Sequence, residues 1–252
     1  MDAPGELVPV GSYVWARATG GRLTTRDRLR ELARAIRSRL PRRATRAFDV
    51  LDPTTIRAPD SALARAAEQL CREVSPDWLT NHGLRSYLYA RALGAIDGIT
   101  RFDDELLYVA AVLHDLGLTE RYGHPTAGTC FSLASADGAR ELAARHGWSE
   151  ARLDTLAATI TYHLNVRVTL DDGVEAYLFN TGVALDVVGS RARELTPEQR
   201  DAVLARHPRT GFRDAFLARY RETAAAAPAC RAAFHLRWLR FGRLVRADPT
   251  SA

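Results

Sequence analysis

The chain has 252 residues, of which 46% are hydrophobic and 26% are charged, as expected of a globular protein large enough to bury a core. Its formal net charge is +5, and all 35 basic residues are arginine, which excludes Schiff-base chemistry and a P-loop lysine. No apolar stretch is long enough to span a bilayer, and the N-terminus lacks the pattern of a signal peptide. We therefore expect a cytoplasmic protein without membrane contact.

The N-terminal region is strongly basic, with ten arginines between Gly21 and Phe48. Apolar residues recur in it at helical spacing: Leu29, Leu32, Ala33, Ile36 and Leu40. This pattern predicts an amphipathic helix that docks its apolar face and leaves its basic face in solvent. We favour that interpretation over nucleic-acid binding, because no aromatic platform accompanies the arginines. Residues 1–58 are predicted to form an N-terminal helical arm.

From Pro59 onward the sequence pattern is almost entirely helical. The predicted helices are Asp60–Val74, Asp77–Leu93, Asp103–His114, Ala134–His146, Glu150–Leu164, Val174–Val188, Pro197–Arg206, Phe212–Thr223 and Cys230–Arg246. Only Val166–Leu170 alternates like a strand, and it is too short to build a sheet. We therefore predict an all-α domain over residues 59–252.

The three cysteines, Cys71, Cys130 and Cys230, are far apart in the sequence, and none belongs to a CxxC pair. Their odd number and their spacing argue against a disulfide framework and against a cysteine zinc site. We expect three reduced thiols.

The first candidate for chemistry is the dipeptide His114-Asp115, at the end of the apolar run "ELLYVAAVL". A buried carboxylate is expensive unless it is paired or bound to a metal. Imidazole and carboxylate are both common metal ligands. The dipeptide alone also fits a C-terminal histidine with a capping aspartate, so both interpretations stay open at this point.

Two further helices offer ligands of the same kind. His82 lies on one predicted helix, and Asp186 lies inside another that is otherwise apolar. On the second helix Gly182 would let another backbone or a ligand approach closely. Facing helices commonly build metal sites from such side chains.

The order His82, His114-Asp115, Asp186 resembles the HD-domain superfamily of metal-dependent hydrolases. Within that superfamily the sequence is most similar to the cyanamide hydratase branch, over about Pro76 to Pro228. The supporting stretches are "NHGLRSYLYARAL", "AAVLHDLGLTERY", "CFSLASADGAREL", "ARHGW", "YHLN", "GVEAYLFNTGVALDVVG" and "HPRTGFRDAFLARYRETAAAAP". The resemblance implies an HD-domain helical bundle.

The resemblance also implies a metal site. Its ligands would be His82, His114, Asp115 and Asp186, holding one divalent ion, for which we expect Zn²⁺, with Fe²⁺ or Mn²⁺ as alternatives. His163 lies where the family has an active-site histidine. Asp115 or His163 would move the proton during catalysis.

Candidate substrate-binding residues surround these ligands in the sequence: Arg85, His124, Phe131, Ser132 and Tyr162. His124 lies in a Gly/Pro loop, a position that suits binding. Ser132 stands where the hydratase branch tends to have a glutamate. The remaining histidines, His146, His207 and His235, are expected at the surface or at helix ends.

These residues lead us to expect a metal-dependent hydratase or hydrolase that adds activated water to a small nitrile-like compound. HD phosphohydrolases often have a lysine where this chain has Leu118. The alternative is a nucleotide phosphohydrolase that uses Arg85, Arg121 and Arg167. A di-iron oxygenase or lyase ranks lower, because the stretch "CFSLASADGAR" lacks a histidine for a second metal. A non-catalytic arginine-rich binding module ranks last. The expected partner is a small molecule; the oligomeric state is left open.

Overall fold

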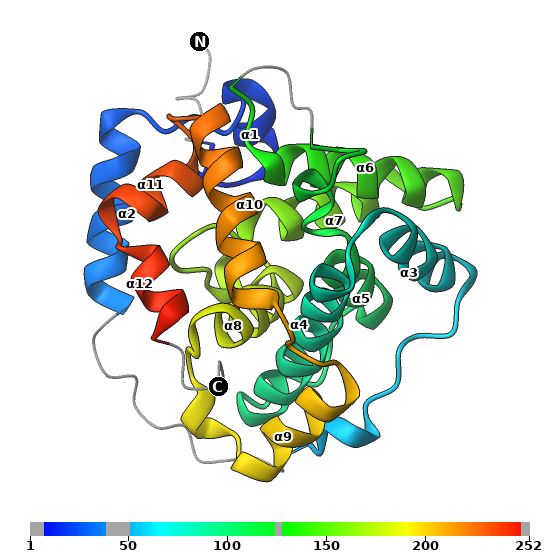
Figure 1. Ribbon diagram of the computed structural model, residues 1–252. Helices are drawn as coiled ribbons and strands as arrows, with labels where there is room; N and C mark the ends of the chain where they lie inside the picture. The colour runs from blue at the N-terminus through cyan, green and yellow to red at the C-terminus, as the bar shows by residue number, and fades with distance from the viewer. Residues whose placement is uncertain (1–7, 39–50, 124–127, 248–252) are drawn as a thin grey trace.

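The computed structural model describes residues 8–38, 51–123 and 128–247 (Figure 1). These ranges contain twelve α-helices and no β-strand, which confirms the predicted all-α class. Within them, no helix has both the length and the hydropathy to cross a lipid bilayer.

The α-helices are, in chain order, α1 (Tyr13–Thr19), α2 (Thr25–Ser38), α3 (Ala62–Val74), α4 (Asp77–Ile96), α5 (Asp104–Leu113), α6 (Phe131–Arg145), α7 (Glu150–Tyr162), α8 (Val174–Val188), α9 (Pro197–Arg206), α10 (Phe212–Ala226), α11 (Arg231–Trp238) and α12 (Phe241–Arg246). Four 3₁₀ turns lie between them: η1 (Pro53–Thr55), η2 (Leu116–Leu118), η3 (Leu170–Asp172) and η4 (Ala192–Glu194).

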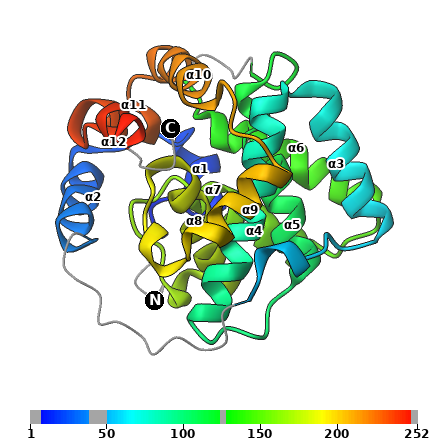
Figure 2. The same cartoon turned by 60° about the horizontal axis from the view of Figure 1, so that its bottom comes forward.

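Helices α4 and α8 pack closely against each other in the middle of the bundle (Figures 1 and 2). Gly182 makes this close packing feasible, because a Cβ atom at its position would lie 2.2 Å from the backbone oxygen of Ser86. Only glycine lets two backbones approach so closely. The expectation of a close approach at Gly182 is thus confirmed, with helix α4 as the neighbour.

Helix α5 lies inside the bundle, and every residue from Leu106 to Leu113 is buried. Its first turn is fixed by Asp103, whose side chain accepts a hydrogen bond from the Leu106 amide at 3.0 Å. Arg152 of α7 donates to the same carboxylate at 2.7 Å. This helix therefore delivers its C-terminal residue, His114, to a fixed place in the core.

The N-terminal arm joins the C-terminal part of the chain. The Leu23 amide donates to the Ala229 carbonyl at 2.8 Å, and Trp15, Leu23 and Phe234 belong to one buried apolar cluster. Helix α1 also packs on α6 and α7. The division of the chain at residues 58 and 59 stays a prediction.

Helix α2 forms as predicted, but the face that it buries differs from the expectation. Leu29 and Ile36 are 64% and 62% exposed, whereas Glu31 is only 1% exposed. Hydrogen bonds hold Glu31 there, since it accepts from Arg34 at 2.8 Å and from the Val166 amide at 3.4 Å. Leu32 of the predicted row still packs against the apolar cluster that contains Trp15 and Leu23. Leu40, the last residue of the apolar row, lies outside the described residues.

The prediction of one helix over Cys230–Arg246 is wrong, because the chain forms two helices there. Arg240 breaks the segment with a φ of 55°, in the left-handed region. This turn separates α11 from α12. Neither glycine nor proline marks the break in the sequence. The three cysteines are buried free thiols, as predicted.

Candidate metal centre

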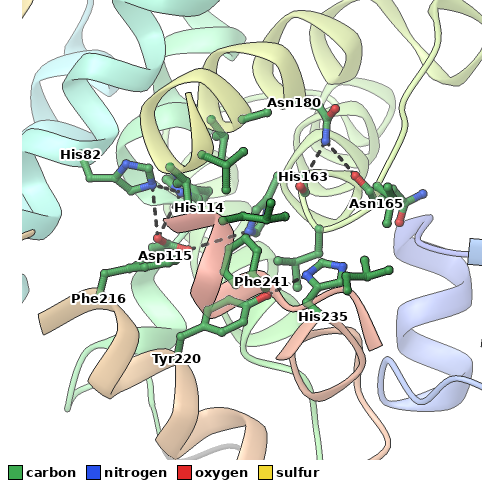
Figure 3. A pocket seen from close by; sticks show the side chains of 18 of the residues that line it. His82, His114, Asp115, His163, Asn165, Asn180, Phe216, Tyr220, His235 and Phe241 are labelled. Carbon is green, nitrogen blue, oxygen red and sulfur yellow. Dashed lines mark hydrogen bonds and ion pairs between the residues drawn. The ribbon is translucent and has the colours of Figure 1, made fainter. Parts of the chain in front are cut away.

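Three side chains from α4 and the end of α5 converge in the core (Figure 3). The Nε2 atoms of His82 and His114 are 3.2 Å apart. An Asp115 carboxylate oxygen lies 3.1 Å from His114 Nε2 and 3.7 Å from His82 Nε2. All three residues are buried, and their ligand atoms lie within 4.8 Å of one another. We call these residues the His–His–Asp group.

The outward-facing nitrogen of each ring is already bound to a hydrogen-bond acceptor. His82 Nδ1 lies 2.6 Å from an Asp186 oxygen, and His114 Nδ1 lies 2.8 Å from the Ala111 carbonyl. A carboxylate and a carbonyl only accept, so each Nδ1 carries the hydrogen. Outer partners of this kind fix the tautomer of metal-binding histidines.

This tautomer leaves the two Nε2 lone pairs facing each other beside a carboxylate. Three acceptor groups so close together in the core, without a donor between them, repel one another. A divalent cation satisfies all three, and imidazole nitrogen with carboxylate oxygen is a donor set typical of zinc, iron and manganese. The His–His–Asp group therefore fits a metal ion.

Asp115 is buried beside three imidazoles. Burial raises its pKa, whereas positive charge on His114, His82 and His163 lowers it, to about 2. His163 Nε2 lies 3.8 Å from the second Asp115 oxygen, and burial lowers the pKa of His163 to about 3. Its Nδ1 is bound to the Ile160 carbonyl at 2.5 Å. The neutral His163 thus presents an Nε2 lone pair beside Asp115.

Asp186 lies behind His82 and outside the His–His–Asp group, and its role as a direct ligand stays a prediction. Its carboxylate receives two bonds from Arg85, at 2.7 Å and 2.9 Å, in addition to the contact with His82 Nδ1. Arg85 is fully buried and also donates to the Pro208 carbonyl at 2.9 Å. Asp186 therefore orients a ligand, and Arg85 orients Asp186.

A cavity of about 180 Å³ opens from the His–His–Asp group. One face of α8 lines it through Asn180, Val183, Ala184 and Val187. Opposite lie apolar residues of α10, α12 and the turn between α11 and α12: Phe216, Phe241, Leu244 and Leu239. Among the described residues that line this cavity there is no arginine, and the chain has no lysine.

Of the predicted substrate-binding residues, Phe131 lines the cavity together with His163. Ser132 does not, because its hydroxyl points toward Cys130 and receives a bond from Arg231 at 3.2 Å. Tyr162 is buried but also lies outside the lining.

Two predicted substrate-binding residues remain, Arg85 and His124. Arg85 does not line the cavity, because its guanidinium is paired with Asp186. His124 lies outside the described residues.

Tyr220 and His235 are lining residues that the sequence analysis missed. The Tyr220 hydroxyl and His235 Nδ1 are 2.9 Å apart, and both residues are buried. His146 and His207 do end helices, as expected, whereas the surface or capping role expected for His235 is wrong. No local sequence signal identified His235, because its burial together with Arg231 on the inner face of α11 is a tertiary feature.

The fold and the site together define an all-α protein with a buried histidine–aspartate group that could hold a metal ion. Residues 79–205, half of the chain, match the HD domain family, and the chain belongs to that family. Its members are generally metal-dependent hydrolases. A search of curated proteins finds no match to this sequence.

Proposed function

We propose that this protein adds water to the C≡N bond of a small neutral compound of the nitrile or cyanamide type. The observation that carries the proposal is the cavity beside the His–His–Asp group, which is mainly apolar and has no cationic side chain among its described lining residues. Such a cavity favours an uncharged substrate over a polyanion. The elements of water added across C≡N give an amide, or urea in the case of cyanamide.

A nucleotide is a poorer match for this cavity. Phosphate recognition needs cations, most often the forked donors of arginine. Arg85 is already paired with Asp186, Arg121 lies over the ring of Tyr122, and Arg167 is exposed. None of the three lines the cavity. These positions disfavour phosphohydrolysis relative to hydration.

His82, His114 and Asp115 would hold the metal, for which we propose Zn²⁺. A bound divalent ion supplies Lewis acidity and lowers the pKa of a bound water to about 7. His163 is placed to relay the water proton, because its Nε2 lies 3.8 Å from an Asp115 oxygen. Delivery of that proton to the substrate nitrogen, while oxygen bonds to carbon, gives the imidic acid, and transfer of its hydroxyl proton to nitrogen gives the amide. The apolar walls keep bulk water away from the reacting carbon.

The test measures metal content and turnover on the same purified protein. Elemental analysis is followed by incubation with cyanamide, acetonitrile and butyronitrile in the presence of Zn²⁺ or Fe²⁺, and with deoxynucleoside monophosphates in parallel. We expect one metal per chain and amide or urea as product. His114→Ala should lose both, whereas His146→Ala, at an exposed helix end, should keep both.

Phosphate release without any turnover of cyanamide or nitriles would refute the proposal and support the phosphohydrolase. Two irons per chain would refute the single-metal site and revive the di-iron oxygenase or lyase. A folded wild-type protein that binds no metal at all would refute both the site and the reaction.

A further inference from the structure

We propose that the substrate carries an apolar body of several carbon atoms, which lies along α8 while the reacting group reaches the His–His–Asp group. This inference rests on the proposed function and names the class of substrate more narrowly than cyanamide. It depends on the size of the cavity, on the chemistry of its walls and on the exposure of Leu244 at its lining.

The cavity is much larger than cyanamide, which has one carbon and two nitrogens. It follows one face of α8 from Asn180 to Val187. Seven residues of an α-helix rise by about 10 Å. Its volume of about 180 Å³ is also far larger than the roughly 10–15 Å³ that one water molecule requires. A substrate as small as cyanamide would leave most of this space filled with water.

Away from the His–His–Asp group and His163, water in this space would find few hydrogen-bond partners, because the other polar side chains of the wall already make hydrogen bonds. Asn165 donates to the Val10 carbonyl at 2.9 Å and accepts from Arg231 at 2.8 Å. Asn180 donates to the backbone carbonyl of Asn165 at 3.0 Å. Tyr220 and His235 bind each other. Apolar groups that displace such poorly held water gain affinity.

The cavity reaches the surface beside α12. Leu244 lines the cavity and is 45% exposed, whereas the His–His–Asp group is buried. Val187 and Phe241 also line it. A neutral molecule that enters here with its reacting group first places its hydrocarbon part against these side chains.

The first experiment compares acetonitrile, butyronitrile and hexanenitrile with cyanamide as substrates of the metal-loaded protein. Each buried methylene should raise kcat/KM by about fourfold, until the chain fills the cavity. Hexanenitrile should therefore exceed acetonitrile by on the order of a hundredfold. Equal values along the series, or a preference for cyanamide, would overturn the inference and leave the proposed function intact.

A variant locates the effect within the cavity. Ala184→Phe places a ring in the apolar part and should remove the gain with chain length. Arg243→Trp is the matched control, because it adds a ring to an exposed position on α12 outside the lining and should keep the gain. A gain that survives in Ala184→Phe would place the hydrocarbon elsewhere and overturn the inference.

A binding measurement separates failure of this inference from failure of the proposed function. Acetamide, butyramide and hexanamide are titrated into the metal-loaded protein by calorimetry, which needs no turnover. Affinity that rises with chain length supports the apolar body even if no nitrile reacts, and in that case only the reaction is wrong. Affinity independent of chain length, or absent for all three amides, would overturn the apolar body.

Discussion

Asp186 has two partners in the core: the imidazole of His82 and the guanidinium of Arg85. All three residues are at most 1% exposed. The carboxylate therefore neutralises a buried positive charge and at the same time fixes the ring of a metal ligand. Burial alone would raise the pKa of Asp186, but Arg85 and His82 lower it well below the usual range.

We predict that Asp186→Asn destabilises the fold by about 3–5 kcal/mol, because the buried charge of Arg85 loses its partner. Metal affinity should fall by about 10–100-fold, since His82 loses the acceptor that orients it. Urea unfolding and a competitive metal titration measure the two effects. Asp60→Asn removes an exposed carboxylate that also contacts an arginine, Arg65, and should leave both quantities unchanged. Equal behaviour of the two variants would contradict the prediction.

Because His235 is buried, we predict that the free energy of unfolding depends on pH. Burial, together with the charge of Arg231, lowers its pKa from 6.5 to about 3. Between pH 6.5 and about 3 the unfolded chain binds a proton that the folded chain does not, so acid favours unfolding. The free energy of unfolding should therefore fall as the pH falls through this window. In His235→Gln the fall should be shallower, and an identical slope would contradict the assignment.

At the residue level, the sequence predicted the members of the site better than their roles. His82, His114 and Asp115 lie on segments whose apolar pattern predicts burial, so a contact between their side chains in the core could be expected. The role of Asp186 could not, because a carboxylate behind a ring and one beside it give the same sequence pattern. Tyr220 and His235 were not predicted as lining residues, because the contact between them depends on how α10 and α11 pack against each other.

At the level of elements, helices were predictable where the hydrophobic period and a cap coincide. Asp103 before α5 and the Gly189 that ends α8 in the left-handed region are such signals. The break at Arg240 carries no such signal, since an arginine adopts a positive φ only when tertiary packing imposes it. On α2, likewise, Leu29 and Ile36 are exposed whereas Glu31 is buried, and Glu31 makes hydrogen bonds that the sequence pattern does not predict.

The contact between α4 and α8 gives a prediction at this scale. Gly182→Ala should destabilise the fold by about 1–3 kcal/mol or more, because the new Cβ would meet the Ser86 carbonyl oxygen at 2.2 Å. Gly242→Ala is the control with the opposite sign, since its Cβ would meet nothing closer than 3.8 Å. It should stabilise α12 by up to about 1 kcal/mol. Denaturant midpoints measure both variants, and a neutral Gly182→Ala would contradict the close contact.

At the scale of the whole molecule, the N-terminal arm supports one wall of the cavity. The Val10 carbonyl accepts from Asn165, which lines the cavity. Gly11 lies directly against that side chain. The sequence showed a basic arm but not its docking site, because contacts between the two ends of a chain leave no local pattern. The arm is therefore part of the frame around the active centre.

This attachment predicts that Trp15→Ala destabilises the protein by about 3–5 kcal/mol, because Trp15 is 7% exposed within the apolar cluster of the arm. Val14→Ala, its neighbour at 63% exposure, should change stability by less than about 0.5 kcal/mol. Thermal or urea unfolding distinguishes them. A small effect of Trp15→Ala would show that the arm is dispensable for the fold.

The rings of His114 and His163 are each anchored to a carbonyl three residues earlier, Ala111 and Ile160, in the same helical turn. Their orientation is therefore set as soon as the helix forms, before any ion arrives. An ion that binds His114 would therefore meet a ring that is already in place, and its uptake would need little rearrangement of the fold.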